Sequence, residues 1–296
     1  MLNIQVKWLL PIPVLSVERV VEFEPITNRT YETLIKYVSA SDENTDLFPL
    51  FRNLLSELCT DKTIDFENVN ILDILSILVR LRSICISPDV KLKIKLPTEN
   101  EQGDIEDKES NLTLALPKLH QTIFENYCEP IEVDLGDSIH IEIHYPRNDK
   151  SLNVYDYVTG ITVDSQKTNM SDLTSEQFDQ LLEQLPPRTT NKLLKAKKQV
   201  EQSYYKMVIV PSSMTKKKQV SLFPDDLSHF LRLMFSENIH NFIEQMYVFV
   251  KFIKMSLSDV MELTPLDTQL YYKTFEREVE EKKKRNAQKE SKSINV

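Results

Sequence analysis

The segment from residue 70 to residue 96, NILDILSILVRLRSICISPDVKLKIKL, decides how the rest of the chain must fold. Its first half places apolar residues on nearly every side of a helix, and such a helix is normally buried. Ser87-Pro88-Asp89 ends this helix, because proline disfavours helical geometry in the residue before it. From Val90 to Leu96 apolar residues alternate with lysines, as in a strand with one solvent-exposed face. The other elements must therefore cover the helix that leads into this strand.

Further helices and strands are predicted on both sides of this segment. Residues 1–25 read as extended because Pro11 and Pro13 exclude a helix there. Apolar periodicity predicts helices over residues 28–39, 46–59, 174–185, 189–203, 227–235 and 239–255, and from 264 onward. Strand patterns predict three hairpins, which pair 90–96 with 111–116, 131–135 with 139–145, and 204–210 with 219–223. We expect an α+β fold, mostly helical, with two or three β-hairpins inserted between helical segments.

Composition divides the chain into three expected parts. Residues 1–128 form an N-terminal helical unit with a hairpin, and its tip is an acidic, solvated loop over residues 97–110. Residues 129–260 form a central hairpin plus a helical unit with a second hairpin, and residues 261–296 form a C-terminal helix and charged tail. Two alternatives stay open. Residues 153–164 fit a short helix or a strand, and the chain beyond Phe275 fits a solvated helix or a frayed end.

Composition also disfavours several classes of protein. Only three glycines are present, and no glycine-rich phosphate loop occurs, so the common nucleotide-binding folds and a cofactor are not expected. A net charge of −9 argues against nucleic-acid binding, which needs a basic surface. The three cysteines are far apart and form no CxxC pair, which suits a reducing cytoplasm. The first residues lack a long apolar run, so neither a signal peptide nor a membrane span is expected.

One strand carries the best arrangement of potential metal ligands. His140, Glu142 and His144 occupy alternate positions of a predicted strand, and would share one face of it. Imidazoles spaced in this way can bind zinc. The simpler interpretation is the polar face of an amphipathic strand, because no second cluster of ligands is evident in the sequence. A metal-dependent enzyme is therefore kept as a weaker alternative, while we expect no metal and no enzymatic activity.

The two ends of the chain carry candidate interaction residues. Thr264-Pro265 opens a helix, because proline is favoured at the first helical position. The apolar stripe of that helix packs either on its own domain or on a neighbouring subunit. Protein interfaces are anchored by aromatic side chains, and the candidates for this role are Trp8, Tyr271, Tyr272 and Phe275.

Four stretches, taken in order, carry a family resemblance. They are residues 23–37 (FEPITNRTYETLIKY), 73–96 (DILSILVRLRSICISPDVKLKIKL), 174–200 (TSEQFDQLLEQLPPRTTNKLLKAKKQV) and 242–280 (FIEQMYVFVKFIKMSLSDVMELTPLDTQLYYKTFEREVE). In pattern and order, from about residue 5 to residue 285, the chain resembles the baseplate hub and hub-assembly proteins of T4-like contractile-tailed bacteriophages. None of the four stretches is a catalytic motif.

The resemblance implies a structural component of the phage tail baseplate, in its hub region, which acts through protein–protein contacts during tail assembly. The implied partners are other baseplate and hub proteins, with an oligomer within the baseplate as an option. The implied locations are the host cytoplasm during assembly and the baseplate of the virion tail. The alternative is a non-virion assembly chaperone that binds hub components and then leaves.

Overall fold

The computed structural model describes residues 8–42, 45–99, 105–136, 138–147, 153–164, 166–169, 174–183, 186–206, 208–209, 220–221 and 227–293. The chain divides into two compact units. The first unit contains residues 1–24, 42–80 and 88–234, and the second contains residues 25–41, 81–87 and 235–296. No helix among the described residues is long and apolar enough to cross a membrane.

The first unit is built around the helix that the sequence predicted. Helix α3 spans Ile71–Cys85, and its part in this unit ends at Arg80. Most of the apolar side chains of this part are fully buried, among them Leu72, Ile74, Leu75, Ile77, Leu78 and Val79. The other helices of the unit are α2 (Phe48–Leu58), α4 (Leu116–Glu125), α5 (Ser175–Glu183), α6 (Pro187–Lys206) and α7 (Leu227–Phe235). The prediction that the 70–86 helix is buried is confirmed.

All described strands of the first unit pair in antiparallel fashion. Three hairpins join β1 (Leu10–Val14) with β2 (Arg19–Phe23), β3 (Asp89–Glu99) with β4 (Ile105–Ala115), and β9 (Val208–Ile209) with β10 (Val220–Ser221). The fourth sheet has the order β5-β6-β7-β8, with strands Ile131–Gly136, Ile139–Ile143, Val158–Val163 and Gln166–Asn169. The 3-10 turns Leu15–Val17 and Val154–Tyr157 complete the unit. The expected α+β, mostly helical fold with inserted hairpins is confirmed.

Several local expectations are corrected. Pairing of β3 with β4 extends to Glu99 opposite Ile105, so residues 97–99 and 105–110 lie in strands. The expected acidic loop over residues 97–110 is therefore mostly paired strand. Its residues 100–104 lie outside the described part of the chain. Residues 204–206, expected in a strand, continue helix α6. Residues 153–164 form a 3-10 turn followed by strand β7.

The described elements of the second unit are all helices or helical turns. It contains α1 (Asn28–Ala40), the end of α3 from Leu81, α8 (Ile239–Val248), α9 (Leu257–Glu262) and α10 (Pro265–Ser293). A π-helical turn, η4 (Phe249–Ile253), continues α8. Four of these helices begin at side-chain caps, because Thr27, Asn238, Ser256 and Thr264 each accept a backbone N–H from the first turn.

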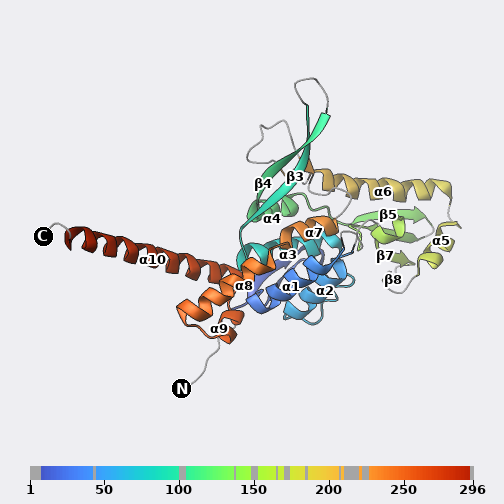
Figure 1. The fold of residues 1–296 in the computed structure, drawn as a ribbon. Coiled ribbons are helices and arrows are strands. Elements are labelled where there is room, and N and C mark those ends of the chain that lie inside the picture. The colour runs from blue at the N-terminus through green and yellow to red at the C-terminus, as the bar shows by residue number, and fades with distance from the viewer. Residues whose placement is uncertain are drawn as a thin grey trace, which may run out of the picture. The chain divides into compact units, whose positions relative to one another are not determined.

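The charged end of the chain is helical as far as Ser293, and it extends beyond α8 and α9 (Figure 1). Its glutamates at 278, 280 and 281 stand four residues before basic residues at 282, 284 and 285, and this order of charges stabilises an exposed helix. One such pair, Glu281 with Arg285, lies at 3.8 Å. The alternative of a frayed end is therefore wrong for the residues up to 293.

Candidate interaction surface

Exposed apolar side chains gather on α8, η4, α9 and α10 of the second unit. Between positions 243 and 271, the large apolar side chains that are exposed among the described residues are Ile243, Tyr247, Val250, Phe252, Leu257, Leu270 and Tyr271. Scattered exposed apolar residues are ordinary, but a concentration of them on neighbouring helices is typical of an interaction site. The side chains that hold these helices together define what the surface can bind.

Asn28 fastens the start of α1 to α9 and to the start of α10. Its backbone N–H donates to the carbonyl of Leu263 at 2.7 Å. Its buried side-chain Nδ2 donates to the carbonyl of Val260 and to Thr268 Oγ1, both at 2.7 Å. Hydrogen bonds made in a buried position hold the helices in one arrangement, because breaking them would leave polar groups unsatisfied.

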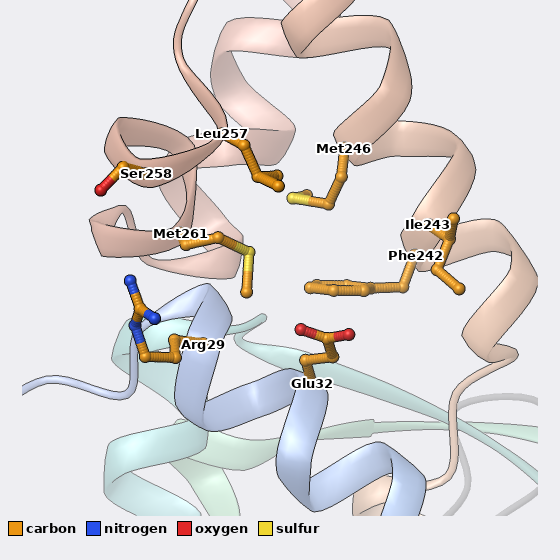
Figure 2. Close-up of a pocket in the computed structure, with 8 residues that line it drawn as sticks. All are labelled: Arg29, Glu32, Phe242, Ile243, Met246, Leu257, Ser258 and Met261. Atoms are coloured by element: carbon orange, nitrogen blue, oxygen red, sulfur yellow. The ribbon is translucent and has the colours of Figure 1, made fainter.

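A methionine-lined groove opens between α1, α8 and α9 (Figure 2). Its volume is about 640 Å³, and the groove is lined by Arg29, Glu32, Phe242, Ile243, Met246, Leu257, Ser258 and Met261. Figure 2 shows Met246, Met261, Leu257 and Phe242 turned towards one another, with Arg29 and Glu32 on the α1 side. We call this space the methionine groove. Methionine side chains adapt to irregular apolar partners, so the groove can receive apolar side chains of different shapes.

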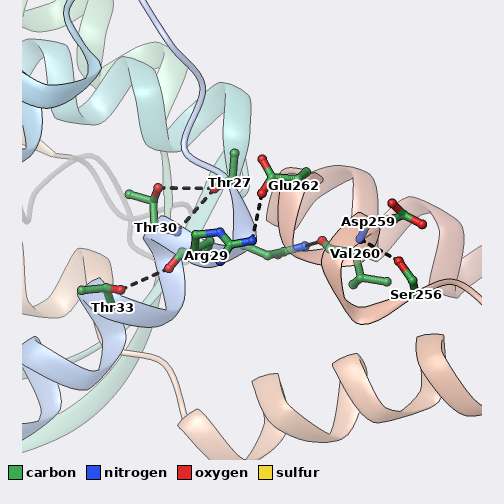
Figure 3. A network of polar contacts seen from close by, with 9 residues as sticks. Thr27, Arg29, Thr30, Thr33, Ser256, Asp259, Val260 and Glu262 are labelled. Atoms are coloured by element: carbon green, nitrogen blue, oxygen red, sulfur yellow. Dashed lines mark hydrogen bonds and ion pairs between the residues drawn. The ribbon is translucent and has the colours of Figure 1, made fainter.

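The charged edge of the methionine groove consists of exposed ion pairs. Arg29 lies 3.0 Å from Glu262 Oε1, and both side chains are more than half exposed (Figure 3). Glu32 accepts a hydrogen bond from Lys36 Nζ at 2.7 Å. Exposed pairs of this kind contribute only about 0–1 kcal/mol to stability. Their charges can therefore exchange partners when another protein binds.

Tyr31 of α1 positions the apolar base of the groove. Its hydroxyl donates to Glu237 Oε2 at 2.7 Å, and its ring lies edge-on to Phe242 with centroids 6.0 Å apart. Burial, together with the Glu237 carboxylate, raises the pKa of the Tyr31 hydroxyl. The neutral phenol therefore persists at physiological pH and keeps donating to Glu237, which holds the Phe242 ring in place.

A second feature lies where η4 meets α10. Lys251 Nζ lies 5.0 Å from the centroid of the Tyr247 ring and 5.4 Å from that of Phe252, and it donates to the Tyr247 hydroxyl at 2.5 Å. The Phe252 ring contacts Phe275 of α10, with centroids 6.5 Å apart. Tyr271 stands one helical turn before Phe275 and therefore shares its face. We call Tyr247, Lys251, Phe252, Tyr271 and Phe275 the aromatic shelf.

The interaction candidates chosen from the sequence fall in both units. Trp8 belongs to the first unit, precedes β1 and is 54% exposed. Tyr271 is also 54% exposed, whereas Phe275 is half-buried against Phe252. Tyr272 is half-buried and lines a small hollow with Asn241, Glu244, Gln245 and Val248. Partial desolvation, then the Glu276 and Glu244 carboxylates, raise the pKa of its hydroxyl.

Sequence reasoning missed Tyr247, Phe252 and the residues of the methionine groove. It predicted one helix over 239–255 with a broad apolar face made of Phe242, Met246, Phe249, Val250 and Ile253. In the structure Phe242, Met246 and Phe249 are buried, while Ile243, Tyr247 and Val250 are exposed. The residues left out of that face were Ile243 and Tyr247, which with Val250 form a second row beside the buried row.

The strand with the histidines does not bring its polar residues together. His140 Nδ1 lies 3.4 Å from Glu132 Oε1 at the surface of the sheet. His144 follows the end of β6, is buried, and donates from Nε2 to the carbonyl of Cys128 at 2.8 Å. A register shift between Glu142 and Ile143 interrupts the alternation that the sequence suggested. Within the described ranges, no group of three or more His, Cys, Asp or Glu residues could hold a metal ion.

Acidification should destabilise the protein through His144. Burial lowers the pKa of this imidazole from its ordinary value of 6.5. Between the lowered pKa and 6.5 the unfolded chain binds a proton that the native state does not, so stability falls as the pH falls through this window. One such group contributes a slope of up to about 1.4 kcal/mol per pH unit. Urea unfolding between pH 7 and pH 5, about the range in which histidine titrates, measures the slope.

A matched variant isolates this contribution. His144→Gln keeps a side-chain N–H donor for the Cys128 carbonyl but cannot titrate. Its stability should depend less on pH than that of the wild type. His120, whose pKa is also lowered by burial, is present in both proteins and cancels in the difference. Equal slopes for the two proteins would contradict the assignment to His144.

Comparison with known proteins gives one match. Residues 1–232 match the family described as T4 bacteriophage base plate protein. No curated protein and no solved structure matches the chain. The match covers every described element from β1 to the main part of α7, and it ends before α8, η4, α9 and α10.

Proposed function

Since the chain belongs to the family of T4 bacteriophage base plate proteins, we propose that it is a structural subunit of the hub region of the baseplate. In this role it remains in the virion tail and acts through contacts with other baseplate and hub proteins. The observation that carries the proposal is the concentration of exposed apolar side chains on α8, η4, α9 and α10. Such a surface is suited to protein contacts.

The composition of purified tails tests this proposal. A structural subunit should be detected by mass spectrometry in tails separated from free proteins, at a fixed ratio to other baseplate proteins. Its position should then follow from labelling the subunit and imaging the tails. A protein abundant in infected cells and absent from mature tails would contradict a structural role in the virion.

The methionine groove favours a second candidate function. An open apolar groove with adaptable side chains suits a protein that holds the apolar segments of several partners in turn. In this alternative the protein is an assembly chaperone that binds hub components and leaves before the tail is complete. Incomplete assembly intermediates would then contain the protein, and the finished tails from the same cells would not.

Truncating the exposed aromatic side chains of α10 should reduce function without unfolding the protein. The variant Tyr271→Ala/Tyr272→Ala/Phe275→Ala removes candidate anchors from positions that are exposed or half-buried. We expect incorporation into tails to fall at least about tenfold, as for the loss of an interface hot spot. Western blots of purified tails give incorporation, and thermal melting gives stability.

Phe124→Ala provides the matched control for this variant. Phe124 is 53% exposed on α4 of the first unit, so its truncation removes a comparable ring from another surface. Incorporation of this control should equal that of the wild type. A large fall in the melting temperature of the triple variant would mean instead that these rings stabilise their own unit.

A further inference from the structure

We propose that two copies of this chain associate through the aromatic shelf in a two-fold symmetric interface. The inference goes beyond the proposed function, because it names a second copy of the chain as the partner and does not depend on where the protein sits in the baseplate. It rests on residues of the second unit alone, namely Tyr247, Lys251, Phe252, Tyr271 and Phe275.

The shelf is one continuous surface. Lys251 joins the rings of Tyr247 and Phe252, and Phe252 contacts Phe275 across the junction of η4 with α10. The π turn adds a residue to the helical repeat and ends at Lys254, which adopts a left-handed conformation with φ 66°. Phe252 thereby keeps 53% of its surface exposed, although it follows Phe249, which is fully buried. A π turn of this kind is often found at functional sites.

The shelf presents enough apolar surface for an interface. Tyr247, Phe252 and Tyr271 are 55%, 53% and 54% exposed. With aromatic side chains of about 150–250 Å² each, they expose roughly 240–400 Å² together. Patches of about this size on a monomer are often functional. Half-buried Phe275 and exposed Leu270 on the same helix widen the surface towards the roughly 800 Å² per partner that a stable interface covers.

The charges on the shelf complement each other under two-fold rotation. Lys251 is held in place by the Tyr247 hydroxyl and two rings, and within the described part of the chain no carboxylate pairs with it. Glu278 is exposed, follows Phe275 by three residues, and shares the α10 face of Tyr271 and Phe275. An isologous interface brings each end of a patch against the opposite end of its copy. Lys251 of each copy then faces Glu278 of the other.

The charge pattern distinguishes a second copy from an unrelated protein as the occupant. A partner for this shelf needs an apolar face with a carboxylate opposite Lys251 and a cation opposite Glu278. The shelf itself has that arrangement. Charge pairs also make association specific, because a wrong register would place like charges together.

Sedimentation equilibrium of the full chain tests the proposal. The wild type should show a concentration-dependent monomer–dimer equilibrium. Phe252→Ser and Tyr271→Ser should each raise the dimer dissociation constant about thirtyfold, the effect of losing one aromatic hot spot. Phe124→Ser, which changes a ring with the same 53% exposure as Phe252, should leave the constant unchanged. A wild type that stays monomeric, or a dimer that the shelf variants do not weaken, would overturn the proposal.

A charge exchange tests the symmetry of the contact and does not depend on removing an aromatic ring. Lys251→Glu alone and Glu278→Lys alone should each dimerise weakly, because each homodimer contains two like-charge contacts. An equimolar mixture of the two variants should regain a dimer of nearly wild-type affinity, because both contacts then join opposite charges. Circular dichroism of each variant checks that it is folded. Failure of the mixture to associate more tightly than either variant alone would exclude the two-fold pairing.

Discussion

Replacing Asp73 by alanine should lower the free energy of unfolding by roughly 2–4 kcal/mol. This carboxylate is fully buried in the first turn of α3. It accepts the backbone N–H groups of Leu15 and Ser16, both at 3.1 Å, the side-chain N–H of Asn70 at 3.0 Å and the hydroxyl of Tyr127 at 3.3 Å. Alanine would leave several of these donors without a partner. Urea unfolding followed by circular dichroism measures the loss.

Two further variants test whether the loss of stability comes from the buried hydrogen bonds of Asp73. Asp73→Asn keeps the volume of the side chain but offers only one acceptor oxygen, so its stability should lie between those of the wild type and the alanine variant. Asp65→Ala is the control at an exposed site. The Asp65 carboxylate is exposed and accepts hydrogen bonds from the neighbouring Glu67 and Asn68, and its loss should cost less than about 1 kcal/mol. An alanine variant at 73 as stable as the control would show that the carboxylate does not hold the 3-10 turn Leu15–Val17 against α3.

The sequence predicted those elements whose formation depends on neighbouring residues. Helix α3 and strand β3 were predicted because apolar periodicity, the stop at Pro88 and the alternating lysines are all local signals. Pro49 and Pro265 are local signals as well, because proline favours the first turn of a helix, and they lie in the first turns of α2 and α10. Local patterns therefore identified most of the helices and the two main hairpins.

The elements that were missed are short or depend on distant contacts. Helix α9 has six residues and one buried side chain, Val260, so no repeat is visible in its sequence. Helix α4 is opened by Leu116-Pro117 directly after β4, and the strand pattern before it concealed its start. The methionine groove needs α1, α8 and α9 together, and no local pattern indicates that three helices so far apart in sequence will meet.

Part of the candidate interaction surface was chosen from the sequence because aromatic residues on a charged helix are conspicuous. Tyr271 and Phe275 were identified in this way. Phe252 was not identified from the sequence, because its exposure results from the π turn. The ordinary α-helical repeat would place Phe252 near the buried face of α8. The partners of Asp73 were also hidden, since Leu15 and Ser16 lie 58 and 57 residues away in the chain.

Replacing Arg52 by methionine should have an effect at least as large, a loss of about 3–5 kcal/mol in the free energy of unfolding. The guanidinium of this α2 residue is buried, and it donates to the carbonyls of Phe66, Val69 and Arg147. Methionine has a similar length and fills the same apolar space, but it leaves the three carbonyls without these donors. Burial lowers the pKa of Arg52 from its ordinary value of 12.5. An arginine side chain nevertheless stays protonated in proteins, so the guanidinium still donates these hydrogen bonds at neutral pH.

Arg52→Lys and Arg29→Met separate the geometry of the guanidinium from its charge. A lysine keeps the charge but lacks the planar fork that reaches several carbonyls at once, so it should recover only a minor part of the loss. Arg29 is more than half exposed and pairs with Glu262, and methionine there should change stability by less than about 1 kcal/mol. Full stability of Arg52→Lys would mean that charge alone suffices.

Amide exchange gives the location of the effect as well as its size. The Arg147 carbonyl that Arg52 binds is adjacent in the chain to Pro146, whose carbonyl accepts the N–H of Ile71, the first residue of α3, at 2.9 Å. Without Arg52 this stretch loses one of the hydrogen bonds that hold it beside the start of α3, so the Ile71 amide should exchange faster. Amides in the middle of α3, such as that of Leu78, should follow only the global loss of stability. Equal acceleration at Ile71 and Leu78 would indicate that Arg52 stabilises the whole unit and not this junction in particular.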